Sequence, residues 1–189
     1  METELKFQTD DLEELAALLR RLGAAEVWPR HFERNLVFDD NQESLRGQGT
    51  LLRLRLAGDR ASLTLKRKPQ NTHPGHAKVM DERETEVADF DATRAILEGL
   101  GYRVAFAYEK YRREYRLGDC LACLDELPFG SYLELEAAGE GELIRCATAL
   151  GLEPAEGIVA NYHQLNLSER EKRGLPPGDG FVFDGWAEK

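Results

Sequence analysis

The first residues of the chain alternate between charged and apolar side chains. Glu2, Glu4 and Lys6 occupy alternate positions, and the apolar residues Leu5 and Phe7 follow Glu4 and Lys6. Successive side chains of a β-strand point to opposite faces, so the alternation predicts a strand over residues 1–8 with one charged and one apolar face. The same pattern returns in residues 132–136, where glutamates alternate with leucines.

Similar alternation and turn-forming residues predict further strands along the chain. The expected strands are residues 1–8, 27–39 with a bend at Pro29, 51–57, 61–68, 79–88, 104–117, 120–125 and 131–137. Leucine-rich helical spacing, with Asp before it and Gly after it, predicts helices. These run from Asp10 or Asp11 to about Leu22, from Asp89 or Asp91 to about Leu100, from Glu140 to Leu150, and over 158–167. Strands dominate and the hairpin turns are short, which predicts an antiparallel α+β domain.

One face of nearly every expected strand carries ionised side chains. They are Arg53 and Arg55, Lys66 and Lys68, Glu82, Glu84 and Glu86, Lys110 and Arg112, Asp125, and Glu134 and Glu136. An open sheet would turn these charges to bulk water, whereas a closed barrel would enclose them and place the helices outside. Because almost every polar position is fully charged, rather than mixed with Ser, Thr and Gln, we favour the barrel. An eight-stranded antiparallel barrel has room for side chains and one small ligand.

Composition narrows the choice of ligand. The 189 residues suffice for one domain with a real core, and the net charge of −10 disfavours binding to nucleic acid. Residues 50–80 nevertheless hold seven basic residues and one acidic residue, which suggests a small anionic ligand. No apolar run approaches the roughly 20 residues that span a bilayer. No secretory signal precedes Glu2, so we expect a cytoplasmic protein with no membrane partner.

The cysteine and histidine spacings give only weak signals. Cys120 and Cys123 have C-x-x-C spacing, but a second pair is missing, so ordinary reduced thiols are favoured over a zinc site. His73 and His76 lie in a Pro- and Gly-containing loop and make a poor metal site by themselves.

A charged interior is costly unless its charges are compensated. Side chains of both signs lower the cost, and so would a divalent cation together with a polyanion. Carboxylates suit hard divalent cations, and the Arg fork suits phosphate oxygens. The pattern therefore favours a triphosphate carrying divalent cations as the ligand.

Several ordered motifs resemble one known family. They are Glu2-Thr3-Glu4-Leu5-Lys6 (E-x-E-x-K), Arg34 before Val37-Phe38-Asp39, Leu52-Arg53-Leu54-Arg55, Leu63-Thr64-Leu65-Lys66, Arg83-Glu84-Thr85-Glu86, Lys110-Tyr111-Arg112 after Ala105-Phe106, Leu124-Asp125 and Leu133-Glu134-Leu135-Glu136. This series is similar to that of the CYTH domains, the triphosphate tunnel metalloenzymes named after class IV adenylyl cyclases and thiamine triphosphatases. The resemblance covers residues 1–167 as a CYTH-like domain, and 168–189 read as an extension that docks on the domain, on a partner, or nowhere.

The resemblance implies a closed eight-stranded antiparallel β-barrel that forms a tunnel, with helices packed outside. It implies metal ligation of Mg²⁺ or Mn²⁺ by Glu2, Glu4, Glu134 and Glu136. It implies triphosphate binding by Lys6, Arg34, Arg53, Arg55, Lys66, Lys68, Lys110 and Arg112. Glu84, Glu86, Asp125 and Lys66 would be catalytic, by completing the metal shell or orienting a water. The family's Ser-Tyr pair is replaced by Asn161-Tyr162, which leaves the role of that segment open.

Two reactions fit such a tunnel, and the sequence does not separate them. Attack by water would make the protein a triphosphatase acting on tripolyphosphate, thiamine triphosphate or a nucleoside triphosphate. Attack by the ribose 3′ hydroxyl of ATP on the α-phosphorus would make it a class IV adenylyl cyclase releasing pyrophosphate. Hydrolysis is slightly favoured because no adenine-specific motif is legible. A noncatalytic polyphosphate- or nucleotide-binding module is a third reading, and the extension could serve homodimerisation or cover one tunnel mouth.

Overall fold

The structure, a computed structural model, describes residues 2–67 and 78–186, and of Glu2 and residues 78–80 only the backbone. Every expected strand is found in this described part. The strands are β1 (Glu2–Thr9), β2 (Ala25–Asp39), β3 (Thr50–Ala57), β4 (Arg60–Arg67), β5 (Lys78–Val87), β6 (Arg103–Leu117), β7 (Cys120–Leu127) and β8 (Gly130–Ala137). Lys68, His73 and His76 lie outside the described residues.

The helices agree with expectation except at two places. They are α1 (Leu12–Arg21), α2 (Ser44–Gly47), α3 (Phe90–Gly99), α4 (Glu140–Ala149) and α5 (Tyr162–Lys172), with a 3₁₀ turn at Pro154–Glu156. The short helix α2 lies where we expected only turns. The last helix starts at Tyr162, because the Asn161 side chain accepts a bond from the Gln164 amide and Gln164 caps Asn161 in return. It continues to Lys172 and so crosses the expected boundary after residue 167.

All eight strands pair in antiparallel fashion, which confirms the predicted α+β class. The pairing runs in the order β1-β5-β4-β3-β2-β6-β7-β8 and returns to β1. Among the described residues, β1 joins β8 through seven residue pairs, but it joins β5 through three, ending at Glu2 and Met80. The rest of β5 extends past these described pairs, and its residues 83–86 are exposed.

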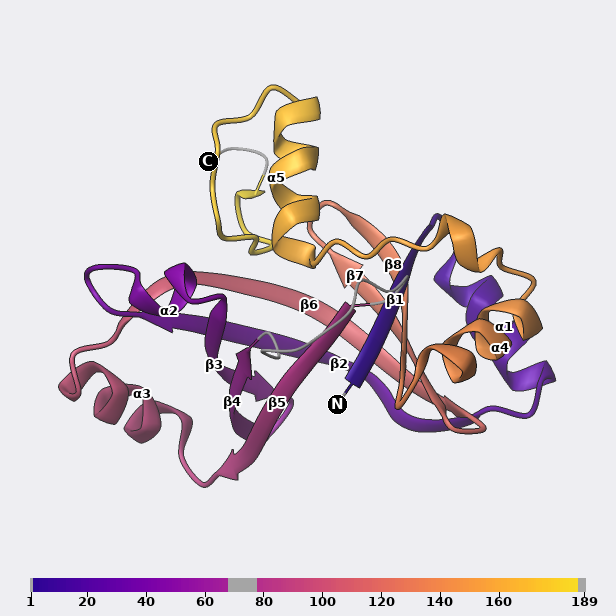
Figure 1. The fold of residues 1–189 in the computed structure, drawn as a ribbon, viewed down its shortest axis with the longest axis horizontal. Helices are drawn as coiled ribbons and strands as arrows, with labels where there is room; N and C mark the ends of the chain where they lie inside the picture. The colour runs from indigo at the N-terminus through magenta and orange to yellow at the C-terminus, as the bar shows by residue number, and fades with distance from the viewer. Residues whose placement is uncertain (1, 68–77, 187–189) are drawn as a thin grey trace.

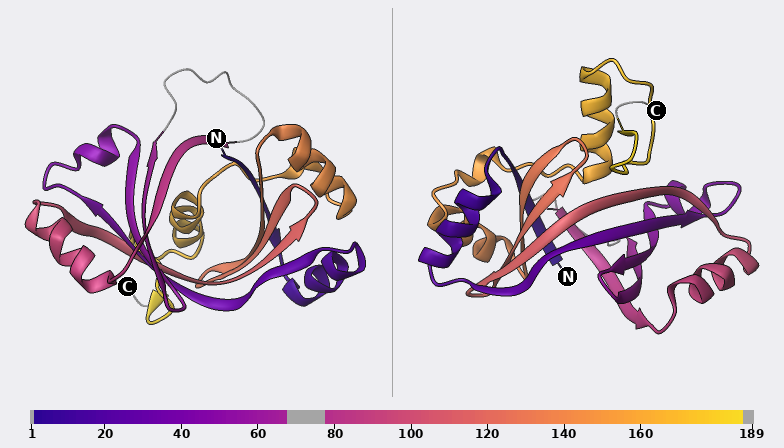
Figure 2. Two further views of the ribbon diagram at one scale, coloured as in Figure 1. Left: turned by 90° about the horizontal axis from the view of Figure 1, so that it is seen from below. Right: turned by 180° about the vertical axis from the view of Figure 1, so that it is seen from behind.

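Helices cover the apolar outer face of the sheet at its two ends (Figures 1 and 2). At one end, α1 and α4 pack on β1, β7 and β8 around buried residues that include Leu19, Leu135 and Leu143. At the other, α3 packs through Leu97 on Leu36 and Leu54 of β2 and β3. The apolar sides of β1 and β8 thus face α1 and α4, and those of β2 and β3 face α3. Among the helices of the described residues, none has both the length and the apolar composition to cross a bilayer.

The C-terminal segment docks on the domain itself. The Phe181 amide donates to the Ala107 carbonyl at 3.2 Å, and the Glu109 amide donates to the Phe181 carbonyl at 2.9 Å. Phe181 and Trp186 are buried with Phe129 in one aromatic cluster. The segment returns from α5 to β6 (Figure 1), which selects the first of the three placements expected for it.

Candidate active site

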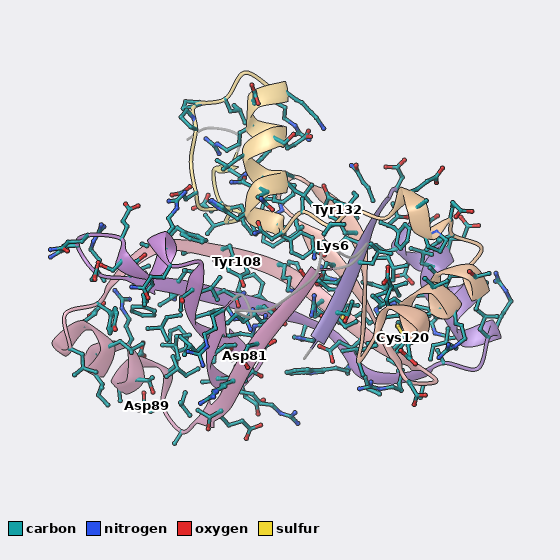
Figure 3. All side chains as sticks on the ribbon, in the orientation of Figure 1. Lys6, Asp81, Asp89, Tyr108, Cys120 and Tyr132 are labelled. Atoms are coloured by element: carbon teal, nitrogen blue, oxygen red, sulfur yellow. The ribbon has the colours of Figure 1, made fainter. Side chains whose placement is uncertain are left out.

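A cavity of about 370 Å³ lies on the charged inner face of the strands. Among the described residues that line it are eight basic and six acidic side chains, so it is basic within an acidic protein. Nine residues expected at the site line this cavity: Glu4, Lys6, Arg53, Arg55, Lys66, Lys110, Arg112, Glu134 and Glu136. Figure 3 shows Lys6 and Tyr108 between the strands, whereas Asp89 lies at the periphery beside α3.

The register of β1 and β8 sets one wall of the cavity. It pairs Lys6 with Glu134 and Glu4 with Glu136. The Lys6 ammonium lies 2.8 Å from a Glu134 oxygen and 3.1 Å from a Glu4 oxygen, and the side chain is 2% exposed. Burial alone would lower the pKa of Lys6, but the charges of Glu134 and Glu4 raise this pKa above its ordinary value. Lys6 is therefore held as a buried cation.

Arg112 joins the acids of three positions. Its guanidinium donates to both oxygens of Asp125, at 2.7 and 2.6 Å, to Glu134, and to Glu136 at 3.4 Å. Asp125 also accepts from Lys110 at 3.2 Å and from the Tyr162 hydroxyl at 2.8 Å. Asp125 is fully buried and is not among the residues that line the cavity. Asp125 is placed to hold Lys110 and Arg112. We predicted it beside a metal or a water, but the structure does not place it at the cavity.

The opposite wall carries Arg53 and Arg55 of β3. Arg53 donates to the Tyr108 hydroxyl at 3.2 Å and to the Thr64 hydroxyl at 3.1 Å. Arg55 donates to Asn35 at 2.9 Å and to Glu33 at 3.2 Å. Burial would raise the pKa of Tyr108, but the positive charges of Arg53 and Arg55 lower it below its ordinary value. The wall is thus electropositive.

Arg34 was expected to bind the triphosphate, but the structure does not place it at the cavity. Its side chain is exposed, while Glu33 and Asn35 on either side of it are fully buried. The period of two along β2 turns position 33 inward, so position 34 must point outward. Sequence reasoning missed Glu33, whose pKa burial would raise but Arg55 and Lys110 lower well below its ordinary value. Its alternation with Asn35 was the available signal.

Glu84 and Glu86 were expected to be catalytic, and the structure does not bring them to the cavity. Both are exposed, and neither lines it. Glu84 accepts a hydrogen bond from Thr64 at 2.6 Å and pairs at 3.4 Å with Arg53, which does line the cavity, and its side chain is 45% exposed. The reason is the short seam between β1 and β5, because β5 at these positions has passed the end of β1. Lys66 does line the cavity and pairs with Glu82 at 2.7 Å.

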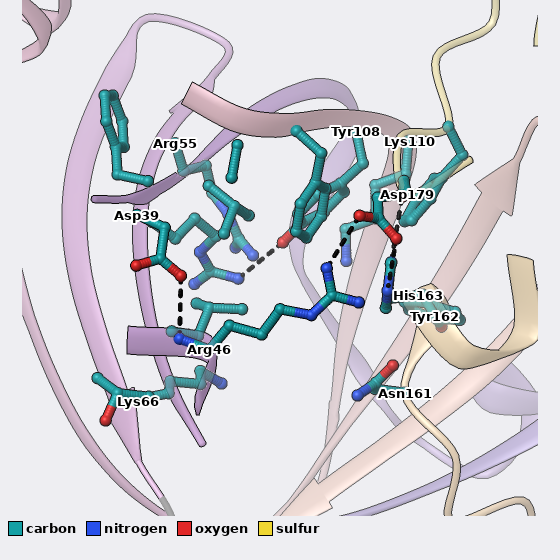
Figure 4. A pocket seen from close by; sticks show the side chains of 18 of the residues that line it. Asp39, Arg46, Arg55, Lys66, Tyr108, Lys110, Asn161, Tyr162, His163 and Asp179 are labelled. Atoms are coloured by element: carbon teal, nitrogen blue, oxygen red, sulfur yellow. Dashed lines mark hydrogen bonds and ion pairs between the residues drawn. The ribbon is translucent and has the colours of Figure 1, made fainter. Parts of the chain in front are cut away.

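The other end of the cavity is lined in part by Arg46, His163 and Asp179, which sequence reasoning did not find. Arg46 donates to Asp179 at 3.0 Å, and His163 lies 3.1 Å from the Asp179 carbonyl oxygen and 5.0 Å from the ring of Phe106. Figure 4 shows Arg46 reaching toward Asp179, with Tyr162 and Asn161 nearby. Ala105 adds apolar surface here. Nothing local marks Asp179, because the docking of the tail brings it to the cavity.

The carboxylates of β1 and β8 fit a hard divalent cation. Glu4, Glu134 and Glu136 offer only oxygen donors, which Mg²⁺ and Mn²⁺ prefer. Each is now balanced by Lys6 or Arg112, so a cation held here would replace those partners. The side chain of Glu2, the fourth expected ligand, lies outside the described residues.

Comparison with known proteins gives the family. The model of the CYTH domain matches residues 1–151. The chain belongs to the CYTH domain family. A curated relative of this CYTH protein, from Methanocaldococcus jannaschii, is called a "putative adenylate cyclase". It is 26% identical over 137 residues, which cover 72% of this chain and 76% of the relative.

Solved structures share the fold at low sequence identity. A "putative adenylate cyclase" from Vibrio parahaemolyticus has a TM-score of 0.74 and 20% identity, covering 87% of this chain and 96% of that one. A "putative adenylyl cyclase" from Hippeastrum, described as having a dominant triphosphatase activity, has a TM-score of 0.60 and 18% identity, covering 93% and 97%. Protein PH1819 from Pyrococcus horikoshii has a TM-score of 0.71 and 21% identity, covering 90% and 100%. The CYTH fold is therefore shared along nearly the whole chain.

Proposed function

We propose that this CYTH protein is a divalent-metal-dependent enzyme that acts on a triphosphate enclosed in the charged cavity as in a tunnel. Its first candidate reaction is hydrolysis of a short-chain or organic triphosphate. The observation that carries the proposal is the convergence of six buried or half-buried cations and three carboxylates on one cavity. A surface that merely solvates a sheet would not hold Lys6 and Arg112 at 2% and 5% exposure.

The pairing of these charges suggests what the ligand must bring. Most cations of the cavity now pair with an acid, as Lys6 does with Glu134 and Arg55 with Glu33. A polyanion alone would bind these cations in place of their acidic partners. The acids would then be buried without a partner, at a cost in free energy. A triphosphate that carries divalent cations offers partners of both signs. This favours a metal–triphosphate over a free anion or a free metal.

The position of each charged residue at the cavity suggests its role in the reaction. Arg53, Arg55 and Lys66 on one side, with Lys110 and Lys6 on the other, would hold the phosphates and stabilise charge developing on their oxygens. A divalent cation, when bound by the carboxylates, would neutralise phosphate charge and polarise the phosphoryl oxygens. Asp125 would keep Lys110 and Arg112 aimed at the substrate.

A cyclase reaction is the second candidate, and the apolar end of the cavity favours it. Leu51, Ala105 and Phe106 line this end beside the charged part, and His163 stacks on Phe106. Such surfaces suit the flat organic group of a nucleotide or of thiamine, whereas tripolyphosphate would leave them unused. ATP would place its base here and its phosphates on the cations, as the cyclase names of the relatives suggest.

One assay separates these reactions. The full chain is incubated with ATP, tripolyphosphate or thiamine triphosphate, each with Mg²⁺ or Mn²⁺, and the products are identified by chromatography. Orthophosphate release supports hydrolysis, whereas cyclic AMP with pyrophosphate in equal amounts supports cyclisation. Tight binding of every triphosphate without turnover would leave a noncatalytic binding module and overturn the enzyme proposal.

A pair of variants ties any activity to the cavity. Glu136→Gln should lose at least about 100-fold in turnover, because a metal-binding carboxylate is removed while the residue's shape remains. Glu86→Gln, an exposed glutamate that does not line the cavity, should retain turnover. Equal activity in both variants would remove Glu136 from the metal site.

A further inference from the structure

A second cluster of ligand-type side chains lies outside the residues that line the cavity. His31 and Glu33 of β2 and Glu114 of β6 each offer one ligand atom, and these three atoms lie within 4.8 Å of one another. None of the three lines the cavity or belongs to the E-x-E carboxylates of β1 and β8. Their donor set is also different, because it contains an imidazole nitrogen.

Two atoms of the cluster are buried without a hydrogen-bond partner among the described residues. They are Nε2 of His31 and Oε2 of Glu33, on side chains that are 7% and 0% exposed. Lys110 lies 3.7 Å from that Glu33 oxygen, which is too far for a hydrogen bond. Orphaned polar atoms of this kind are rare in folded proteins and point to a missing partner.

The orientation of the His31 ring also indicates a missing partner at Nε2. Nδ1 lies 2.9 Å from the Pro29 carbonyl oxygen, which can only accept, so Nδ1 must carry the proton. Nε2 then turns its lone pair toward Glu33 Oε1, 3.5 Å away. Glu33 also lies 3.2 Å from Arg55 and 3.7 Å from Lys110, so its carboxylate is paired as an anion. A lone pair that faces an anion is stable only with a proton or a metal ion between them.

The surroundings hold the ring in this place. The pairing of β2 with β6 shifts register between Trp28 and His31, at the predicted bend of Pro29. Such bulges re-aim side chains next to functional sites. The Trp28 ring stacks on His31 with centroids 3.8 Å apart and shields it from solvent. A carbonyl that fixes the far nitrogen of a histidine is also the usual support of a metal-binding imidazole.

We propose that His31, Glu33 and Glu114 form a binding site for a divalent transition metal such as Zn²⁺, separate from the carboxylates of the cavity. An imidazole with two carboxylates suits Zn²⁺ or Co²⁺ better than Mg²⁺, which prefers oxygen ligands and keeps several waters. Arg55 and Lys110 also lie near Glu33 and weaken the attraction for a cation. Bound metal would compete with them for Glu33 and release both cations toward the cavity. The site goes beyond the proposed function and does not depend on it.

The test uses the full chain, free of any affinity tag, and Co²⁺ as a visible probe for Zn²⁺. One equivalent of Co²⁺ should give an absorption band of a nitrogen- and oxygen-ligated ion, and it should quench the fluorescence of Trp28, whose ring contacts His31. Trp28→Phe should remove most of this quenching and leave the absorption band. Absence of stoichiometric binding, or quenching that persists in Trp28→Phe, overturns the proposal.

Two variants on different strands test the ligands independently. His31→Asn and Glu114→Gln should each weaken Co²⁺ binding by about 10–100-fold or more. His73→Gln/His76→Gln, which alters the histidines of the 68–77 segment, should bind Co²⁺ as the unaltered protein does, and so should Glu4→Gln in the cavity. Unchanged affinity in both ligand variants overturns the site.

The competing explanation is a proton on Nε2, which would make His31 an imidazolium paired with Glu33. Nitrogen-15 NMR of the histidines distinguishes the two. The His31 resonances should change on addition of one equivalent of Zn²⁺, with Nδ1 still protonated. A doubly protonated His31 whose resonances ignore Zn²⁺ at neutral pH would overturn the proposal.

Discussion

Buried charge is the dominant property at the scale of single residues. Lys110 and Arg112 are 3% and 5% exposed, and each rests on Asp125, which is fully buried. The attraction within such a group compensates for lost hydration only when every member is paired. Asp125 accepts four hydrogen bonds from three side chains, so it is the acid on which the others depend most.

Removal of this acid should therefore destabilise the fold. Asp125→Ala leaves Arg112 and Lys110 with too little negative charge in a buried place. We expect a loss of about 3–5 kcal/mol in the free energy of unfolding, measured by urea denaturation followed by circular dichroism. The matched control is Glu126→Ala, whose pair with Arg30 is exposed and should contribute about 1 kcal/mol or less. A small effect in Asp125→Ala would mean that water replaces the carboxylate.

The two arginines Arg53 and Arg34 allow a matched test of substrate binding. Arg53 lines the cavity, whereas Arg34 is exposed on the outer face. Arg53→Ala should weaken tripolyphosphate binding by about 1.5–3 kcal/mol, the usual contribution of a hydrogen bond to a charged group. Isothermal titration calorimetry with Mg²⁺ present measures this. Arg34→Ala should bind as the unaltered protein does, and a loss in both variants would indicate nonspecific attraction.

At the scale of elements, the tail supplies part of one end of the cavity. Gly180 lets it approach β6 closely, because a Cβ at this position would lie 2.9 Å from the Ala107 carbonyl oxygen. The indole of Trp186 donates to Asn166 of α5 at 2.7 Å, and Arg170 donates to the Trp186 carbonyl at 3.0 Å. These bonds hold α5 and the tail together as one hook, residues 162–186, whose Asp179 reaches the cavity.

Loss of the tryptophan should loosen this hook before the rest of the fold. Trp186→Ala removes a buried aromatic side chain and should cost about 3–5 kcal/mol, a loss confined to the hook if it opens locally. Faster hydrogen exchange at the Glu109 amide, which bonds the Phe181 carbonyl, measures local opening. Phe183→Ala is the control, because Phe183 is 39% exposed. Equal exchange in the two variants would mean that Trp186 does not hold the tail.

At the scale of the whole molecule, the cavity holds charges of both signs with a basic excess, while the protein carries a net charge of −10. The acids and cations that would receive metal and phosphate are now each other's partners. Binding of metal and of triphosphate should therefore be coupled, since each frees the residues that the other needs.

This coupling can be measured in both directions. Tripolyphosphate affinity should rise when Mn²⁺ is added, after correction for Mn²⁺–tripolyphosphate association in solution. Mn²⁺ affinity, followed by electron paramagnetic resonance, should rise by the same factor when tripolyphosphate is present. Glu136→Gln should reduce both increases. Independent binding of the two would contradict the exchange of partners.

The pH dependence of stability follows from the same buried pairs. Burial would raise the pKa values of Glu134 and Glu33, but Lys6 and Arg55 respectively, with other cations, hold them well below the ordinary value. The contribution of these two glutamates to the free energy of unfolding is therefore complete above the unfolded-state pKa of about 4.3. It is lost as the pH falls below that value.

Urea denaturation between pH 7 and pH 3 measures this effect. Each glutamate should contribute a slope of up to about 1.4 kcal/mol per pH unit in the acid range. Glu134→Gln should be less stable at pH 7 and should show a shallower decline below pH 5. Glu114 acts with the opposite sign, because burial raises its pKa. A stability that stays level down to pH 3 would refute paired glutamates.

The sequence by itself determined the strands, their faces and the family, because these depend on local alternation and ordered motifs. Glu4 and Lys6 of β1 and the paired arginines of β3 have their charges on the inner face, as the period of two requires. Most of the candidate site was therefore predictable. The tertiary structure alone decided how deep each charge lies and what it meets.

Three residues show why the sequence did not determine the depth and the partners of every charge. Glu84 faces the same side of β5 as Glu82 and Glu86, but its side chain is exposed, because the seam between β1 and β5 is short. Glu33 replaces Arg34 inside, since the register of a bent strand sets which of two adjacent residues points inward. Asp179 reaches the cavity through packing far along the chain. Alternation is a property of neighbours in sequence, whereas exposure depends on where strands end and on what docks over them.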